Sequence, residues 1–180
     1  GGGSALASDI IWHELKLAKE KGIPIVASMA NVAASGGYYI SCMADTIMAG
    51  QNTITGSIGV FGLLAEGDKF YDSKLGITFD TVKTTNFSNF PNSALLSRPI
   101  TDEEKTIIQR GVDLIYDDFL KRVADGRGMS KEAVHEVAQG RVWTGTQAKE
   151  KGLVDVIGGL EDAIELAANM AKLNKDDYRT

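Results

Sequence analysis

The stretch Ala33-Ala34-Ser35-Gly36-Gly37-Tyr38-Tyr39 sets a serine among small residues, between a segment with strand character and one with helix character. At a sharp strand-to-helix turn, the residues two before and two after the central serine must be small to avoid collision, and Ala33 and Gly37 meet that condition. The stretch therefore predicts an α/β fold that holds Ser35 out of a sheet as a candidate nucleophile. A serine in a glycine-rich turn is more often a plain turn residue, so the other residues must decide between the two.

The composition is that of a globular chain of 180 residues, with 43% hydrophobic and 24% charged residues and a net charge of −5. This length fits a single domain. Because the chain is acidic and has no basic block, we expect no nucleic-acid partner. The single cysteine, Cys42, has no second cysteine for a disulfide or a zinc site, and we expect it in the core. The sequence holds no metal or cofactor motif, so we expect neither.

Alternating helix and strand patterns predict a largely parallel sheet flanked by helices. The expected helices are residues 5–21 (with Leu6, Ile10 and Leu17 near one face), 38–44, 70–75, a long helix from a Thr101/Glu104 capping box to Gly126 or Gly128, 130–138, one opened by a Thr144/Gln147 capping box, and 160–173. The expected strands are residues 24–29, 46–49, 77–83 and 153–157, with 53–60 as a strand or loop and 84–100 as a long loop.

A base for Ser35 is harder to find in the sequence. His13 and His135 are the only histidines, and both lie in helical patterns with charged neighbours, which gives a Ser-His-Asp triad little support. A serine without a histidine can use a lysine whose amine is desolvated enough to be neutral. Lys83 is the lysine best placed by its order in the chain, although a solvated surface lysine is the commoner role.

Four segments together resemble the signal peptide peptidase A (protease IV) family of the ClpP/crotonase superfamily. They are Gly1-Gly2-Gly3-Ser4, VAASGGYYISCMAD (32–45), TITGSIGVFG (53–62) and GRVWTGTQAKEKGLVD (140–155). The resemblance covers nearly the whole chain and implies a ClpP/crotonase-like fold in which Ser35 is the nucleophile. It implies that the amides of Gly3 and Gly36 form the oxyanion hole, and that Ser57 orients a catalytic lysine. By composition alone, Ser57 would be a turn hydroxyl.

The chain departs from this family at the lysine, because Ser88 of NFSNF stands where short members have the base. Long members contain two copies of the fold, with the lysine in the first and the serine in the second, and this chain resembles the second. We therefore expect a fragment of a larger chain, without its N-terminal strands. In this one protease-like domain, residues 1–100 form the sheet core with the site and residues 101–180 a helical part. Alone it is expected to be weakly active or inactive.

The resemblance implies a Ser-Lys endopeptidase that degrades cleaved signal peptides and similar apolar peptides, bound as an added strand. It also implies a homo-oligomer that includes the upstream half of the same protein. It further implies an anchor outside this chain, on the periplasmic side of a bacterial inner membrane. Two alternatives remain open. A crotonase-like acyl-CoA enzyme is disfavoured by the elbow serine and by the lack of a clear acidic dyad, and a non-catalytic scaffold half is disfavoured by the presence of both Ser35 and Ser57.

Overall fold

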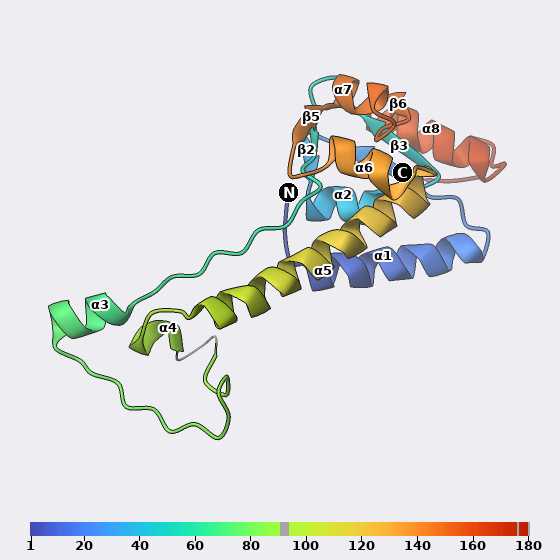
Figure 1. Ribbon diagram of the computed structural model, residues 1–180. Coiled ribbons are helices and arrows are strands. Elements are labelled where there is room, and N and C mark those ends of the chain that lie inside the picture. Colours follow the sequence, from blue (N-terminus) through green and yellow to red (C-terminus); the bar gives the residue numbers. More distant parts are fainter. Residues whose placement is uncertain (91–93, 176, 180) are drawn as a thin grey trace. The chain divides into compact units, whose positions relative to one another are not determined.

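The computed structural model describes residues 1–90, 94–175 and 177–179 of the chain (Figure 1). It divides into two compact units. Unit 1 consists of Gly1–Val60 and Ile115–Thr180, and unit 2 consists of Phe61–Leu114. Unit 1 holds the strands of both sheets, and unit 2 holds short helices and the first half of a long helix.

Unit 1 is built on two small sheets. The first has the order β1-β3-β6, with β1 (Val26–Met29), β3 (Thr46–Ala49) and β6 (Val156–Ile157) all parallel. The second has the order β2-β4-β5, in which β2 (Val32–Ala34) runs parallel to β4 (Ile54–Gly56) and β5 (Val142–Thr144) is antiparallel. The prediction of a largely parallel sheet with helices is confirmed.

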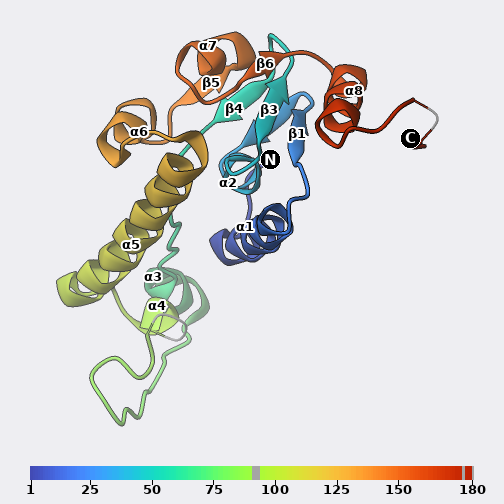
Figure 2. The same cartoon turned by 90° about the vertical axis from the view of Figure 1, so that its right-hand side faces the viewer.

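Helices flank the strands of unit 1 (Figure 2). They are α1 (Ala5–Glu20), α2 (Gly36–Ser41), the second half of α5 (Asp102–Arg127), α6 (Lys131–Val137), α7 (Gly145–Glu150) and α8 (Leu160–Met170). Helix α1 packs on α2, while α8 packs against β1 and α7 against β4, β5 and β6. Both predicted capping boxes form, with Glu104 N–H donating to Thr101 Oγ1 at 3.2 Å and Gln147 N–H donating to Thr144 Oγ1 at 3.3 Å.

The core of unit 1 lies between the strands and α2, α5 and α6. Its fully buried side chains include Tyr38, Ile47, Val123 and Leu153. The Tyr38 hydroxyl donates to the carbonyl of Leu153 at 2.9 Å. Cys42 is free and buried, as expected, and burial raises the pKa of its thiol to about 12. A thiol with so high a pKa is an inert packing group at neutral pH.

Hydrogen bonds, an ion pair and a cation–π contact hold α1 against α2 and α5. Asp9 on α1 accepts from Tyr39 Oη at 2.7 Å and from Arg122 Nε at 3.2 Å. The Arg122 guanidinium also lies 4.0 Å from the ring centre of Trp12. Burial, followed by the hydrogen bond to Asp9, raises the pKa of Tyr39 to about 12. These contacts hold α1, which directly follows Gly1 to Ser4, against α2 and α5.

Unit 2 contains α3 (Asp68–Phe70), which continues into the π-helical turn η1 (Tyr71–Leu75), and α4 (Ala94–Ser97), followed by the first half of α5. The expected helix at 70–75 is confirmed, and it ends at Gly76 with φ 64°, as predicted. The expected strand at 77–83 is wrong. Its alternating residues are exposed and meet no described strand of unit 2, so the pattern has no ladder to join.

Other boundaries also differ from the predictions. The apolar run at 24–29 does not lead straight to Ser35, because the chain passes to the second sheet at residues 30–31 and forms β2 first. The following helix begins at Gly36 rather than Tyr38, and β6 begins only at Val156. Residues 153 and 154 are buried without strand pairing, which accounts for their strand-like sequence. No helix within the described parts of the chain is long and apolar enough to cross a membrane.

Candidate active site

Ser35 occupies the turn between β2 and α2, where the sequence predicted it. Its φ of 53° and ψ of −118° lie in a backbone region that residues other than glycine rarely adopt. The conformation is held at both ends, because Ser35 N–H donates to the Gly56 carbonyl at 2.9 Å and Tyr39 N–H donates to the Ser35 carbonyl at 2.8 Å. A backbone of this kind costs about 1–3 kcal/mol. Strand, strained serine and helix together give the geometry of a nucleophile elbow.

The small residues around Ser35 are required by close backbone packing. A Cβ on Gly37 would lie 3.8 Å from Ala33 Cβ and 3.2 Å from the Gly1 carbonyl oxygen. A Cβ on Gly36 would lie 2.8 Å from Ser8 Oγ and 3.3 Å from Gly3 N, so it would collide. The small residues predicted at this turn therefore let two stretches of backbone meet beside the serine.

The N-terminal glycines lie against the elbow. Gly37 N–H donates to the Gly1 carbonyl at 3.2 Å, and a Cβ on Gly2 would lie 3.7 Å from Ser35 Oγ. Among the hydrogen bonds of the described residues, none uses the N–H of Gly3 or of Gly36. The Gly36 N–H is free because it opens α2 and has no carbonyl one turn earlier in the helix. The structure thus brings together the two amides that the resemblance assigned to an oxyanion hole.

Ser57 lies beside Ser35. Strands β2 and β4 are parallel with Ala34 paired to Gly56, so each serine follows its strand directly at the same carboxyl edge. Ser57 also has a positive φ of 48°, and its N–H donates to the Arg141 carbonyl at 2.7 Å. The two serines that the sequence singled out are thus brought together, each on a backbone that its neighbours hold in place.

No base accompanies these serines in the described residues. His135 bonds to Tyr116 and Gln139, and His13 is exposed on α1. The amine of Lys19 is bound to Asp45 and to the Met43 carbonyl. Among the described residues, no hydrogen bond or ion pair joins a lysine or histidine to either serine, so the structure gives no support to a Ser-His-Asp triad.

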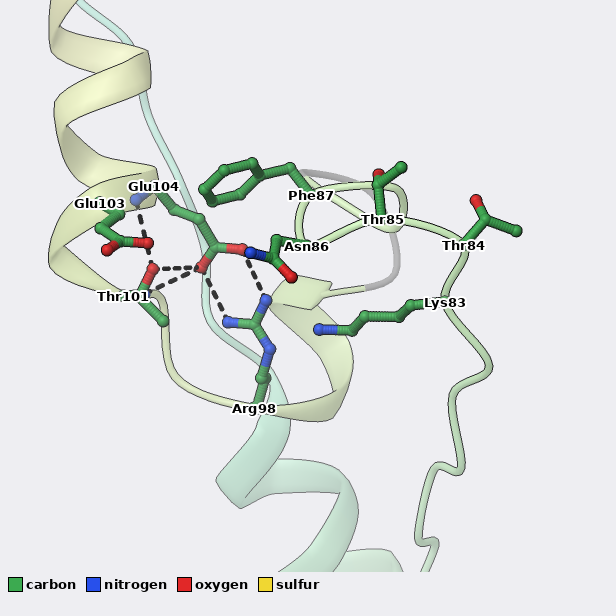
Figure 3. Close-up of a pocket in the computed structure, with 9 residues that line it drawn as sticks. All are labelled: Lys83, Thr84, Thr85, Asn86, Phe87, Arg98, Thr101, Glu103 and Glu104. Atoms are coloured by element: carbon green, nitrogen blue, oxygen red, sulfur yellow. Dashed lines mark hydrogen bonds and ion pairs between the residues drawn. The ribbon is translucent and has the colours of Figure 1, made fainter.

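Lys83 belongs to unit 2, where it is exposed and lines a cavity of about 360 Å³ (Figure 3). The cavity is also lined by Thr84, Thr85, Asn86, Phe87, Arg98, Thr101, Glu103 and Glu104. Glu104 is 1% exposed and binds both terminal nitrogens of Arg98, at 2.5 and 2.8 Å. These bonds, with that from the Thr101 backbone, lower the pKa of Glu104 to about 2. Ser88 donates its hydroxyl to the Thr85 carbonyl at 3.2 Å.

The sequence reasoning missed the supports of the Ser57 loop. The Arg141 carbonyl receives the Ser57 N–H, and Trp143 packs against Gly56, where a Cβ would lie 2.8 Å from its Cδ1. Both residues stand in the GRVWTG segment, for which the sequence predicted only the Thr144 helix cap and the resemblance. Gly56 has a φ of 77°, so glycine is needed there on both counts. A group of three His, Cys, Asp or Glu residues suited to a metal ion does not occur among the described residues.

The fold resembles that of a solved structure. ClpP1 of Listeria monocytogenes, solved as a mutant, superposes with a TM-score of 0.53 at 17% identity, over 91% of this chain and 71% of that one. This likeness agrees with the ClpP/crotonase-like fold that the resemblance implied.

Sequence comparison gives the family. Protease 4 of Haemophilus influenzae is 42% identical over 97% of this chain and 28% of its own length. The chloroplastic serine protease SPPA of Arabidopsis thaliana is 40% identical over 96% of this chain and 25% of its own length. A putative signal peptide peptidase SppA of Enterococcus faecium is 42% identical over 96% of this chain and 49% of its own length. The chain thus spans a quarter to a half of these relatives. Because residues 17–174 match the profile of peptidase family S49, the chain belongs to that family.

Proposed function

We propose that the chain carries the nucleophile of a Ser-Lys serine endopeptidase, with Ser35 as that nucleophile. The observation that carries the proposal is the strained elbow at Ser35, with Ser57 at the same sheet edge and two unpaired amides alongside. Family membership supports peptide-bond cleavage as the reaction. Strain of this kind persists only where the surrounding structure enforces it, and it is typical of reactive groups.

In the proposed reaction, Ser35 Oγ attacks the carbonyl carbon of the scissile peptide bond. A neutral lysine amine takes the hydroxyl proton, and the Ser57 hydroxyl holds that amine in place. The negative oxygen of the tetrahedral intermediate is bound by the N–H groups of Gly3 and Gly36, and one such donor is worth about 3 kcal/mol. The amine then protonates the leaving nitrogen, and water releases the acyl group from Ser35.

The lysine is proposed to come from another part of the protein, the upstream half of a long-form peptidase. One observation supports this source: among the described residues, no lysine or histidine is bonded to Ser35 or Ser57. The resemblance, which sets Ser88 at the base position of shorter members, favours the same source. Lys83 is the alternative within the chain. On this proposal the isolated chain hydrolyses peptides weakly or not at all.

The proposed substrates are cleaved signal peptides and similar extended apolar peptides. Strand β2 lies at the end of its sheet, directly before Ser35, and Val32 on it is 48% exposed. A substrate added to this edge as a further strand would pass the nucleophile. The name of the Enterococcus faecium relative supports this class of peptide. Assembly as a homo-oligomer and action on the outer side of a bacterial inner membrane belong to the same proposal.

Trapping the acyl-enzyme tests the nucleophile directly. A full-length S49 peptidase carrying this segment would be mixed with an apolar peptide ester, quenched in acid and mapped by mass spectrometry. We expect the acyl mass on the peptide containing Ser35 and no adduct in Ser35→Ala. The matched control His13→Gln, far along α1 from the elbow, should acylate like the parent. An adduct that persists at another residue in Ser35→Ala would overturn the assignment.

A further inference from the structure

The loop that carries Ser57 is held by the turn at residues 139–141. Ser57 N–H donates to the Arg141 carbonyl at 2.7 Å, and Gly140 N–H donates to the Ile58 carbonyl at 2.9 Å. The two segments are packed without space, because a Cβ on Gly59 would lie 2.8 Å from the Gly140 Cα. The position of Ser57 therefore depends on the position of the turn at residues 139–141. The bonds that hold this turn also hold Ser57 in place.

Gln139 is the centre of the bonds that fix this turn. Its own φ is 60°, unusual for a residue with a side chain. Its N–H donates to Tyr116 Oη at 3.2 Å, and its side-chain oxygen accepts from Arg141 Nη2 at 2.9 Å. Its side-chain nitrogen lies 3.0 Å from His135 Nε2, and His135 Nδ1 lies 3.0 Å from Tyr116 Oη. Gln139 thus links α5 through its backbone N–H, and α6 and the turn through its side chain.

These partners determine the protonation of His135. A guanidinium only donates, so the Gln139 atom that meets Arg141 must be the amide oxygen. The amide nitrogen, also a donor, then faces His135 Nε2, which can accept only if it carries no proton. The proton of the neutral ring is therefore on Nδ1, from which it is donated to Tyr116 Oη.

Protonation of His135 at Nε2 breaks this arrangement. Two donors would then face one another between His135 and Gln139. Turning the amide by half a turn would restore that bond, but it would point the amide nitrogen at the Arg141 guanidinium instead. In either case one bond of the set is replaced by a repulsive contact, and the turn that receives Ser57 loses part of its support.

We infer that Gln139 and neutral His135 are positioning residues for Ser57, and through it for the lysine base. The inference rests on the proposed function, since it adds a second layer to the same site. Because Gln139 can pair with only one protonation state of the ring, a proton gained at His135 Nε2 weakens the support of Ser57. Protonation of His135 acts on Ser57 through the hydrogen bond from the Ser57 N–H to the Arg141 carbonyl, and not through contact with substrate.

Charged groups around His135 do not replace these bonds. On α6, Lys131 and Glu132 lie one turn before His135 and Glu136 follows it, while Asp117 follows Tyr116 on α5 and Arg141 stands on the turn. Asp117 is already bound by Lys121 and Lys131, and Arg141 also donates to the Glu136 carbonyl at 2.6 Å. Among the described residues, the ring nitrogens of His135 bond only to Tyr116 and Gln139. The protonation of His135 Nε2 therefore acts directly on its hydrogen bond with Gln139.

Two substitutions of Gln139 separate positioning from folding. Gln139→Gly removes the side chain but keeps the positive φ without strain. Gln139→Glu keeps the shape and makes both side-chain oxygens acceptors, so that it suits a protonated His135 and Arg141 together. His13→Gln is the matched control, because His13 is the other histidine of the chain and is exposed on α1.

The first measurement is the imidazole nitrogen NMR spectrum of this chain at pH 8. In the parent we expect the His135 ring in the Nδ1–H tautomer. In Gln139→Gly we expect the His135 ring to show both tautomers, in proportions closer to those of the exposed His13 ring. A parent His135 in the Nε2–H form would overturn the inference. This result does not depend on peptidase activity, so it is independent of the proposed function.

The second measurement is kcat/KM for peptide hydrolysis from pH 8 to pH 5.5, in a full-length S49 peptidase carrying the segment. We expect the ratio of Gln139→Glu to parent to rise about three- to tenfold on acidification, the worth of one hydrogen bond. The ratio for His13→Gln should stay constant. A ratio for Gln139→Glu that is independent of pH would overturn the inference, whereas a loss of all Ser35-dependent hydrolysis at every pH in the parent would instead overturn the proposed function.

Discussion

At the scale of single residues, the site is defined by backbone conformations that cost stability. Ser35 and Ser57 have φ values of 53° and 48°, and both follow the last residues of paired parallel strands. A side chain at such a φ is strained, whereas glycine is not. The chain accepts this cost at the two residues for which a catalytic role is proposed, a placement that a fold selected for stability alone would not require.

A pair of substitutions at Ser35 measures this strain. Ser35→Gly and Ser35→Ala both remove the hydroxyl, but only alanine keeps a Cβ at φ 53° and ψ −118°. We expect Ser35→Gly to exceed Ser35→Ala in free energy of unfolding by about 1 kcal/mol, measured by urea denaturation. The opposite order would show that the elbow is not strained in solution.

Some residues of the site could be predicted from the sequence and others could not. The position of Ser35 at a turn could be predicted because small residues two before and two after it follow from strand-to-helix geometry, whereas Gly36 and Ser57 were singled out only by the family resemblance. Gln139 and Arg141 could not be predicted, because they act through a side-chain amide and a backbone carbonyl that meet Ser57 only in the folded chain. The cavity that Lys83 lines could not be predicted either, since its walls come from residues 83–87 and 98–104, which meet only in the folded chain.

At the scale of elements, local signals predicted helices better than strands. The capping boxes placed the starts of α5 and α7 correctly, because each box is a set of bonds within one turn. Strands β2 and β5 have three residues each, too short for a period to show. Helix α1 formed as expected, yet Leu6 and Ile10 are exposed while Ser8 and Trp12 are buried, because packing on α2 decides which face is covered.

Helix α5 provides two glycines with opposite expected effects. No atom outside the helix lies within 4 Å of a Cβ on Gly111, so Gly111→Ala should raise the free energy of unfolding by about 0.5–1 kcal/mol. A Cβ on Gly126 would overlap the Cys42 carbonyl oxygen and lie 2.9 Å from Met43 Cα, so Gly126→Ala should lower it by about 2 kcal/mol or more. Chemical denaturation of both variants measures the difference. Equal effects would contradict the close packing of α5 on α2.

The start of α5 should be sensitive to acid. The pKa of Glu104 is lowered from 4.5 to about 2, first by Arg98 and then by the Thr101 backbone. A carboxylate with a lowered pKa stabilises the fold above its unfolded value, and this contribution is lost as the pH falls from about 4.5 toward 2. We expect hydrogen-exchange protection of the first turn of α5 to decrease over that window in the parent.

Glu104→Gln is the control for this acid effect, because it keeps the size of the side chain but has no proton to gain. Its protection of the same amides should be lower than that of the parent at pH 6 and nearly constant down to pH 2. If parent and variant lose protection in parallel, the ion pair with Arg98 does not stabilise the start of α5.

At the scale of the whole molecule, the proposed nucleophile and Lys83, the candidate base within the chain, belong to different units. Unit 1 contains both serines and both amides, while Lys83 and Ser88 belong to unit 2. The chain also spans only 28% of Protease 4 of Haemophilus influenzae and 25% of chloroplastic SPPA. The described residues place the proposed nucleophile and the proposed oxyanion donors together without a bonded lysine or histidine, which fits the proposal that another part of the protein supplies the lysine.

The central claim is that Ser35 is the nucleophile and that its base lies outside this chain. The most direct test is hydrolysis of an apolar signal-peptide-like substrate by three proteins: a full-length S49 peptidase carrying this segment, its Ser35→Ala variant, and the 180-residue chain alone. We predict cleavage by the first and background rates for the other two, a loss of at least about 1,000-fold. Full activity of Ser35→Ala would contradict the nucleophile, and cleavage by the chain alone would contradict an external base.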